Sequence, residues 1–411
     1  MTNERRVPPA WVLSIPIATF GITAGFGIVT VPQMLAAQGL SGGKIAVDVA
    51  IITSPTFWAF LLAPMLDVRF RRRTYALLFG LLAAAAAAVT VLYHSSAVVI
   101  VSAMTIGFVS LSLYQAAVGG WAGALIEKDQ DSKLGAWDAV TMISSDGLGV
   151  LLSGYLTQHL APGLAAPLTL AIFLSPMLSF FFIPAPPPDA TMARESFLRF
   201  ARAVASLFQR REILVGLTLF CLPCASFALT NTLGGWGKDF HTSPAMVSFF
   251  GGIGAILAGA VGSLVVPLIA KKIRLRPLYL AIGMAGAGFT LSLLLLPRAP
   301  GTFGLAFLGE NIFQASAFAT SFAITYEVIG KGNPLAATIF GLLTSATNLP
   351  IVAMEIVDGH GFDWRGVSGA FLADALVSGT VCVVLWIVLF HLLRMQDWHS
   401  AAAQEAAVKA R

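Results

Sequence analysis

Acidic residues inside long apolar stretches are the groups of this sequence best suited to chemistry. Asp146 and Glu310 lie about twelve and about eight residues inside such stretches, and no Lys or Arg lies at a comparable depth. In a membrane an ionised carboxylate is costly unless it is paired, solvated or neutralised. Without a basic partner, these two groups are suited to binding and releasing a proton, or to binding a cation. We therefore predict Glu310 and Asp146 as proton-coupling residues.

Four further acids lie nearer to the ends of apolar stretches. They are Asp48, Asp138, Glu355 and Asp374, and no Lys or Arg inside the membrane is expected to pair with any of them. For these four, a structural role is favoured, in which a protonated carboxyl group forms a hydrogen bond with a neighbouring helix. The same structural alternative stays open for Asp146 and Glu310.

The composition identifies the environment in which these acids lie. Of the 411 residues, 57% are hydrophobic and 11% are charged, against roughly 25% charged residues in a typical soluble domain. Mean hydropathy is +0.82. So few charges do not cover the surface of a soluble enzyme. The net charge of +5 comes from basic residues scattered between apolar runs, so no nucleic-acid partner is expected. Three Cys give no disulfide framework.

Apolar stretches of about 20 residues span a bilayer as helices, and the sequence has twelve candidates. They cover residues 10–37, 43–66, 74–93, 97–126, 134–158, 163–184, 213–235, 244–270, 277–297, 302–328, 335–357 and 367–394. The first is too long for a signal-peptide core. We therefore predict an all-α membrane protein with twelve transmembrane helices.

Basic residues indicate the orientation of these spans. Of the 25 Lys and Arg residues, 21 lie at the termini or in alternate loops on the same side as the termini. The other side holds only Lys44, Lys238, Arg298 and Arg365. Because basic loops stay in the cytoplasm, we expect both termini to be cytoplasmic. The expected location is a bacterial inner membrane.

Internal similarity divides the chain into two halves. Residues 63–71 align with 266–274, and Pro16 and Gln115 match Pro223 and Gln314 in the corresponding spans. Each match alone is weak, but together they occur in order at similar shifts. They indicate a duplicated six-helix unit, and many secondary transporters are built from such repeats.

A polar segment separates the two halves. We predict an N-terminal six-helix half over 1–184, a cytoplasmic linker over 185–212 and a C-terminal six-helix half over 213–411. Apolar residues within 195–208 follow a helical period, with Arg199 and Arg202 beside them. This pattern is typical of an amphipathic helix lying on a membrane surface.

The turn after the second span resembles a known motif. Ala63 is followed by Asp67 and then by the run Arg71, Arg72 and Arg73. With two six-helix halves and a basic middle loop, this turn resembles the major facilitator superfamily, whose motif is Gly-x-x-x-Asp-Arg-x-Gly-Arg-Arg. The chain keeps the Asp and the basic cluster but lacks both glycines. The resemblance implies that Asp67 and the three Arg residues form a cytoplasmic gate.

A narrower resemblance rests on residues 20–25, 38–45 and 62–67. These segments are similar to the muropeptide-permease and acetyl-coenzyme-A-transporter branch, which certain siderophore importers also resemble. The muropeptide permeases carry acidic residues in span 4, whereas residues 115–120 of this chain have none. The resemblance implies a glycopeptide, muropeptide or siderophore as a possible substrate.

In the resembled family, spans 1, 4, 7 and 10 line a central cavity. The polar and aromatic candidates on these spans are Thr23, Tyr114, Gln115, Trp121, Thr230, Asn231, Asn311 and Gln314. Glu310 and Gln314 share one helical face because they are four residues apart. We expect these residues to contact the substrate. Hydrogen bonding between helices is the alternative.

Other motifs point to no cofactor. The Cys221-x-x-Cys224 spacing lies inside a span, and the glycines of 251–254 fit helix packing better than nucleotide binding. No phosphate-binding loop or metal-ligand spacing occurs. We predict a secondary active transporter that moves a small organic solute by alternating access, with protons as coupling ion. We expect the protein to contact membrane lipid and to be a monomer. An intramembrane enzyme or a lipid scramblase is the alternative.

Overall fold

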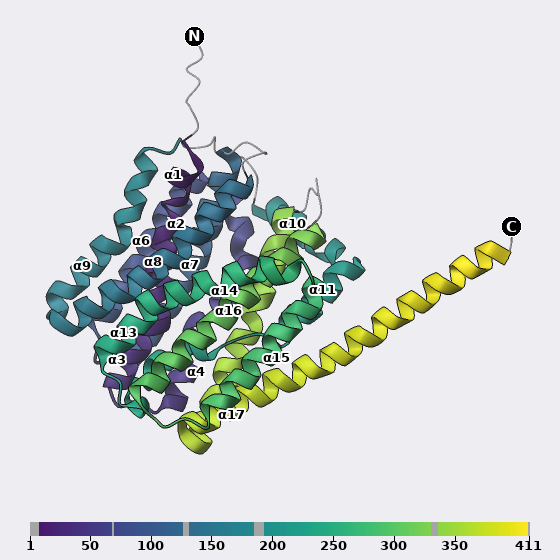
Figure 1. The fold of residues 1–411 in the computed structure, drawn as a ribbon. Coiled ribbons are helices and arrows are strands. Elements are labelled where there is room, and N and C mark those ends of the chain that lie inside the picture. Colours follow the sequence, from purple (N-terminus) through teal and green to yellow (C-terminus); the bar gives the residue numbers. More distant parts are fainter. Residues whose placement is uncertain (1–7, 68–69, 126–130, 185–192, 330–335, 410–411) are drawn as a thin grey trace, which may run out of the picture.

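The structure is a computed structural model that describes residues 8–67, 70–125, 131–184, 193–329 and 336–409. Within these ranges every regular element is a helix. The helices run roughly alongside one another in a bundle, and the last part of α17 continues beyond it (Figure 1). The predicted all-α class is confirmed.

The first six spans come from helices of the N-terminal half, several of them divided by short 3-10 or π segments. In chain order they are α1 (Ala10–Ser14), α2 (Ile17–Gly25), η1 (Phe26–Thr30), α3 (Val31–Ala37), α4 (Gly42–Thr53), α5 (Pro55–Trp58), η2 (Ala59–Asp67), α6 (Arg72–Leu92), α7 (Ala97–Leu125), α8 (Asp131–His159), α9 (Pro162–Leu174) and η3 (Ser175–Phe181).

The remaining helices form the connecting segment and the second six spans. They are α10 (Ala193–Leu207), α11 (Arg211–Cys221), α12 (Leu229–Thr232), η4 (Leu233–Phe240), α13 (Pro244–Phe249), η5 (Phe250–Gly254), α14 (Ala255–Ala270), α15 (Leu275–Leu293), α16 (Pro300–Ile329) and α17 (Ala336–Lys409). Helix α17 contains two spans, because Arg365 and Gly366 have non-helical backbone angles and Gly366 has a positive φ of 62°.

Among the described residues, eight helical stretches are long and apolar enough to cross a membrane. One of them, Thr338–Val388, holds both spans of α17. Helices α8 and α15, and the interrupted pair α11 and α12, supply the other three. The described chain therefore contains twelve spans in two sets of six, as predicted.

The two halves repeat each other in local detail. Arg71 and Arg274, 203 residues apart, are both extended residues that precede the third helix of their half. Pro16 lies between α1 and α2, and Pro223 lies just after α11. Since Pro cannot donate a backbone hydrogen bond, the first and seventh spans are interrupted at matching places. The seventh span, expected to be continuous over 213–235, is non-helical from Leu222 to Ala228.

Helix α10 occupies part of the segment between the halves. Its Phe200 ring packs edge-on against Phe60 of η2, with 6.2 Å between ring centroids. Leu207, the last residue of α10, is fully buried in the core of the second half. The helix therefore contacts both halves. The proposed division at 185–212 stays a prediction.

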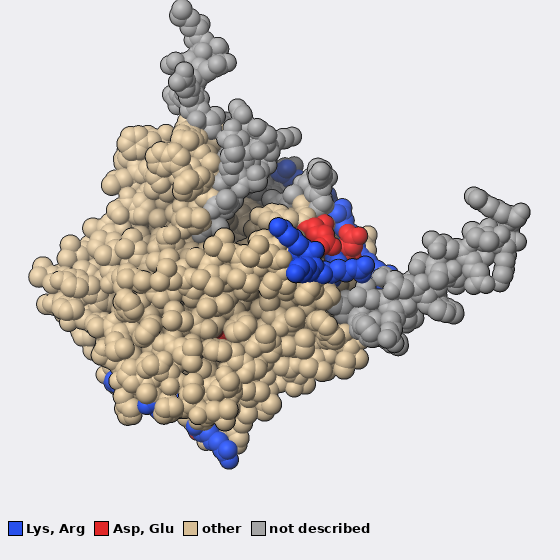
Figure 2. Space-filling model, in the orientation of Figure 1, with Lys and Arg blue, Asp and Glu red and all other residues tan. Residues whose placement is uncertain are grey.

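Charged side chains mark the two ends of the bundle. We call the end with Arg72 and Arg274 the basic end, and the end with Lys44, Lys238 and Arg298 the opposite end. Figure 2 shows Lys and Arg at both ends of one face, with a broad area between them that is almost free of charge. Such an area fits the apolar interior of a bilayer.

The two halves are packed together at the opposite end. Trp236 Nε1 donates to Gly42 O at 3.2 Å, and Lys238 Nζ donates to Ala36 O at 3.0 Å. Both donors belong to the second half and both acceptors to the first. Trp236 is fully buried. The structure therefore holds the opposite end closed.

Candidate functional site

A chain of hydrogen-bonded side chains crosses the middle of the bundle. The Glu355 carboxylate of α17 accepts from Thr53 Oγ1 of α4 at 2.8 Å and from Asn231 Nδ2 of α12 at 2.7 Å. Glu355 has no exposed surface, and Thr53 is 3% exposed. Because Thr53 belongs to the first half and the other two residues to the second, this contact joins the halves.

The same series of hydrogen bonds continues through the interrupted seventh span to α16. Gln314 Nε2 donates to Thr230 Oγ1 at 2.7 Å and is 3.4 Å from Phe227 O. Phe227 has a positive φ of 49°. Where a helix stops, carbonyl oxygens lose their helical partners, and Gln314 provides one for Phe227. The structure thus brings together Thr230, Asn231 and Gln314, three of the predicted cavity residues.

Three buried acids gather inside the second half, and we call Glu310, Asp358 and Asp374 the acid group. Glu310 and Asp358 are fully buried, and Asp374 is 3% exposed. Asp358 interacts electrostatically with both of the others. Thr290 Oγ1 donates to Glu310 Oε1 at 2.6 Å. Neighbouring carboxyl groups repel one another when ionised, so this group is suited to holding protons.

The acid group has free hydrogen-bonding capacity. Among the described residues, Glu310 Oε2, Asp374 Oδ1 and both carboxyl oxygens of Asp358 have no hydrogen-bond partner. No three His, Cys, Asp or Glu side chains in the described ranges are arranged to share a metal ion. A buried polar atom without a partner is costly, and a protonated carboxyl group reduces that cost.

Aromatic rings pack beside the polar residues of α16. Phe313 stacks on Phe227 at 5.9 Å between centroids and lies 5.6 Å from Phe289. Asn311 Nδ2 donates to Phe307 O at 2.8 Å, within its own helix. These rings give one wall of the site an apolar surface, which suits the body of an organic solute.

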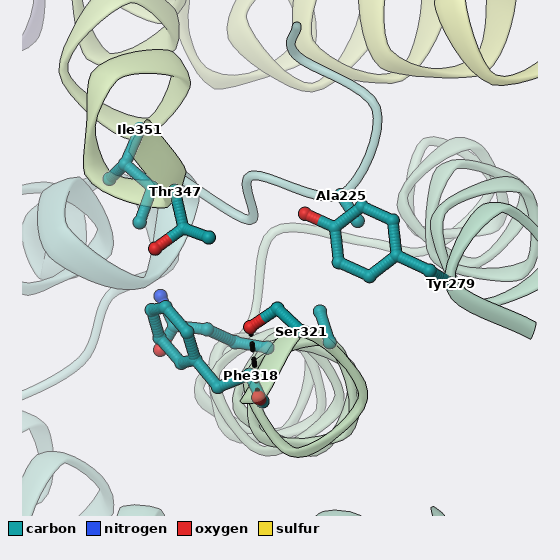
Figure 3. Close-up of a pocket in the computed structure, with 8 residues that line it drawn as sticks. Ala225, Tyr279, Phe318, Ser321, Thr347 and Ile351 are labelled. Atoms are coloured by element: carbon teal, nitrogen blue, oxygen red, sulfur yellow. Dashed lines mark hydrogen bonds between the residues drawn. The ribbon is translucent and has the colours of Figure 1, made fainter. Parts of the chain in front are cut away.

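A small cavity lies next to the hydrogen-bonded chain in the second half. Its lining residues are Ala225, Tyr279, Gln314, Ala317, Phe318, Ser321, Thr347 and Ile351. Figure 3 shows hydroxyl groups of Tyr279, Ser321 and Thr347 reaching into this region from three different segments. The Ser321 hydroxyl donates to Phe318 O at 2.9 Å. The cavity is a polar recess beside Gln314.

Asp146 lies in the first half, where α8 packs against α2. A Cβ added at Gly25 of α2 would lie 2.6 Å from Asp146 Oδ1, so only glycine permits this approach. Oδ1 is buried and has no hydrogen-bond partner among the described residues. Thr23 is also buried, and its hydroxyl donates to Thr19 O at 2.8 Å in its own helix. The two predicted proton sites therefore lie in different halves.

The predicted cavity residues of the fourth span are of two kinds. The Tyr114 hydroxyl donates to Pro16 O at 2.7 Å, and Trp121 Nε1 donates to Pro184 O at 2.8 Å. Both side chains are buried, so this packing favours a structural role that fastens α7 to neighbouring spans. Gln115 is exposed and stays a candidate for solute contact.

The predicted gate lies at the basic end. The Arg73 guanidinium is 6.0 Å from the centre of the Trp121 ring. Arg72 lies against Gly120 of α7, and Arg71 is exposed. The side chain of Asp67 lies outside the described part of the structure. The two described contacts are within the first half, and the gate stays a prediction.

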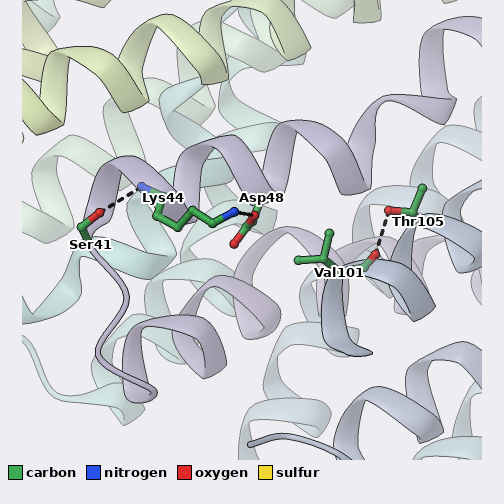
Figure 4. A network of polar contacts seen from close by, with 5 residues as sticks. All are labelled: Ser41, Lys44, Asp48, Val101 and Thr105. Atoms are coloured by element: carbon green, nitrogen blue, oxygen red, sulfur yellow. Dashed lines mark hydrogen bonds and ion pairs between the residues drawn. The ribbon is translucent and has the colours of Figure 1, made fainter. Parts of the chain in front are cut away.

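The expectation that no basic residue pairs with the buried acids is wrong for Asp48. Lys44 Nζ forms an ion pair with Asp48 one turn further along α4 (Figure 4). The Asp48 side chain is 3% exposed and that of Lys44 is 56% exposed. Residues four apart lie on one helical face, and the long Lys side chain reaches inward from the opposite end.

Sequence reasoning did not single out Asp358 or Thr53, and it favoured a structural role for Glu355. The predicted eleventh span stops at 357, so Asp358 fell outside it, whereas the helix continues to Trp364. Glu355 and Asp358 are three residues apart and share a helical face, a signal that was available. Nothing in the sequence marks the Thr53 hydroxyl, because Thr is common in membrane helices.

Twelve apolar spans in two repeated halves, joined by a buried polar contact, are the architecture of a secondary transporter. The chain belongs to the Major Facilitator Superfamily, whose family model matches residues 13–354. The family and fold inferred from the sequence are thereby confirmed.

Solved structures of other transporters share the fold. One is a D-xylose-proton symporter, 15% identical, with a TM-score of 0.70, covering 92% of this chain and 96% of that chain. The nucleoside transporter NupG is 11% identical, with a TM-score of 0.67 and coverages of 93% and 98%. The xylose transporter XylE from E. coli, in an inward open conformation, is 14% identical, with a TM-score of 0.63 and coverages of 92% and 94%. No curated protein matches the chain.

Proposed function

We propose that this transporter couples the movement of a small organic solute to protons. The acid group carries the proposal. Glu310 is fully buried and close to Asp374 and Asp358. Ionised carboxylates in such a place are costly, and a proton is the simplest group that removes the charge. Release of that proton when the site meets water links protonation to the conformational cycle.

The proposed mechanism is alternating access. The halves rock about the central site, so that one end of the bundle opens while the other closes. Closure of the opposite end by Trp236 and Lys238 supports this proposal, because both side chains bond from one half to the other and these bonds must break when that end opens. Asp146, in the first half, is a second proposed proton-coupling residue.

The proposed solute is neutral, zwitterionic or cationic. In the described spans the groups near the site are amides, hydroxyls, carboxyls and aromatic rings, including Asn231, Gln314, Glu355 and Phe313. These favour a solute with hydroxyl, amide or ammonium groups over one with several phosphates. A glycopeptide, a muropeptide or a siderophore remains our proposed substrate class. Proton coupling agrees with the D-xylose-proton symporter among the structures of the same fold.

The experiment that tests the proposal uses the purified protein in proteoliposomes. A panel of sugars, peptides, muropeptides and siderophores first identifies a ligand by competition binding. Glu310→Gln should then abolish accumulation driven by a pH gradient but leave counterflow exchange partly intact, because exchange needs no net proton movement. Asp146→Asn should act in the same direction but more weakly. Unchanged pH-driven accumulation in Glu310→Gln would refute the role of Glu310.

We further propose that the protein lies in a bacterial inner membrane as a monomer, with the basic end in the cytoplasm. Single cysteines at Arg72 and Arg274 should react only with a reagent supplied to the cytoplasm, and one at Lys238 only from the periplasm. The asymmetry of the basic residues predicts this result. Labelling of positions 72 and 274 from opposite sides would contradict the duplicated twelve-span topology.

A further inference from the structure

Glu355 occupies an unusual position, since it joins the two halves and lies beside the acid group, where it interacts electrostatically with Asp358. Both of its carboxyl oxygens are used, one by Thr53 of the first half and one by Asn231 of the second. It is fully buried. Among the buried acids whose hydrogen bonds are described, it is the one bonded across the two halves.

The interface that contains Glu355 extends from the middle of the bundle to the opposite end. Gly43 of α4 lies against Asp363 of α17, and a Cβ added at Gly359 would lie 2.8 Å from Gly43 O. These small residues let α4 and α17 approach closely. Any movement that separates α4 from α17 would break the Thr53–Glu355 bond.

Thr53 can serve either protonation state of Glu355. Its hydroxyl oxygen is 2.8 Å from Glu355 Oε2 and 3.0 Å from Val49 O. A hydroxyl has one proton to donate and can also accept. With ionised Glu355 it donates to the carboxylate. With protonated Glu355 it accepts from the carboxyl group and donates to Val49 O. The contact between the halves is therefore possible in both states.

The groups around Glu355 determine in which of its protonation states the interface between the halves closes. Asp358, on the same helix, interacts electrostatically with Glu355. On the helices packed against α17, the titratable and charged groups with described side chains are Lys44 and Asp48 on α4, Arg199 and Arg202 on α10, Arg211, Glu212 and Cys221 on α11, Arg276 and Tyr279 on α15, and Glu310, Tyr326 and Glu327 on α16. Helix α17 itself carries His360, Asp363, Arg365, Asp374 and Cys382. Lys44 is already paired with Asp48. An ionised Glu355 sealed in this place lacks a cation of its own.

We propose that Glu355 is a proton-sensitive latch, which must be neutral for α4 and α17 to close over it at the opposite end. When the halves separate, Thr53 leaves with the first half, while Asn231 stays with Glu355 in the second. The carboxyl group then meets water and releases its proton, and closure requires that a proton return. This inference rests on the proposed proton coupling, and it assigns to Glu355 a positioning role distinct from that of Glu310.

The test measures opening at the opposite end directly and needs no solute. A reporter cysteine replaces Ile45, a buried residue of α4 that contacts the second half beside Gly235, in a variant without Cys221, Cys224 and Cys382. The full-length protein in nanodiscs is treated with a maleimide from mildly acidic to mildly alkaline pH. The labelling rate should rise with pH in this parent protein.

Two variants separate the latch from a merely structural contact. Glu355→Gln keeps a neutral amide that can bond to both partners, so its labelling should stay slow and rise with pH much less than in the parent protein. Thr53→Val should raise labelling about fivefold at acidic pH, as expected for loss of one hydrogen bond. Thr56→Val is the matched control, because its hydroxyl donates only to Thr53 O within the same segment, at 2.8 Å.

Each outcome decides the matter. A pH response in Glu355→Gln equal to that of the parent overturns the latch, as does equal labelling of Thr53→Val and Thr56→Val. A Glu355→Gln profile flatter than that of the parent, combined with solute accumulation that does not depend on a pH gradient, supports the latch and overturns only the proposed coupling. The two failures are therefore distinguishable.

Discussion

The closure of the opposite end leads to a quantitative prediction for Trp236. Its indole N–H donates across the halves to Gly42 O, and its ring lies 5.1 Å from Phe362. Trp236→Phe removes the donor and reduces the ring while keeping an aromatic side chain. Since Gly42 begins α4 and its carbonyl can accept a bond inside that helix, the change leaves no buried acceptor without a partner.

The magnitude follows from the two lost contributions. One neutral hydrogen bond contributes about 1 kcal/mol, and the smaller ring in a fully buried site costs about another 1 kcal/mol. Both losses fall on the state in which the opposite end is closed. A change of about 2 kcal/mol shifts the equilibrium between closed and open states by about thirtyfold toward the open state.

The assay is the maleimide labelling rate of a cysteine at Ile45, which is 1% exposed in the closed structure. Trp121→Phe is a closely matched control. Its indole N–H also donates to a backbone carbonyl, that of Pro184 at 2.8 Å, and its ring is 1% exposed. That contact lies inside the first half. Trp121→Phe should therefore lower the melting temperature without changing the labelling rate.

Two results would refute this reasoning. Labelling in Trp236→Phe at the rate of the parent protein would mean that the bond between the halves does not hold the opposite end closed. Equal acceleration by Trp121→Phe would mean that labelling reports general loosening of the fold. A faster rate confined to Trp236→Phe would support closure by this contact.

Two further predictions concern stability. Gly25→Ala should lower the free energy of unfolding by about 1–3 kcal/mol, because its Cβ would crowd Asp146. Gly288→Ala, with no atom within 4 Å of its Cβ, should be neutral or slightly stabilising. Thermal unfolding in detergent compares the two variants, and equal losses would contradict the packing argument. Lys44→Gln should destabilise by about 1–3 kcal/mol by leaving buried Asp48 without its partner, and adding Asp48→Asn should recover most of the loss; additive losses in the double variant would exclude this explanation.

Part of the candidate site was visible in the sequence. Glu310, Asn231 and Gln314 stand out because polar side chains are rare in such apolar helices. Their separate importance follows from the cost of placing them in a bilayer. The sequence does not reveal their hydrogen-bond partners, since Asn231 contacts Glu355, a residue 124 positions away. A helix of given hydropathy can be rotated about its axis in many ways, and each rotation offers different partners.

For Tyr114 and Trp121, the sequence does not decide between solute contact and a structural role. Their position on the fourth span suggests solute contact, but their polar atoms bond to the carbonyl oxygens of Pro16 and Pro184. A tyrosine or tryptophan side chain has an apolar body and one polar atom. Whether that atom serves a solute or a neighbouring backbone depends on which face of the helix turns inward.

The sequence by itself determined the class, the twelve spans and the duplication. In a bilayer each span must satisfy its backbone hydrogen bonds internally, so length and hydropathy are local properties that can be read residue by residue. Only the tertiary structure decided which acids meet. The fold-back of α17 at Arg365 and Gly366 brings Asp374 to Asp358, and packing of the halves brings Thr53 to Glu355, 302 residues away. These contacts depend on how each helix is rotated about its axis, and that rotation is set by side-chain packing against neighbours distant in sequence.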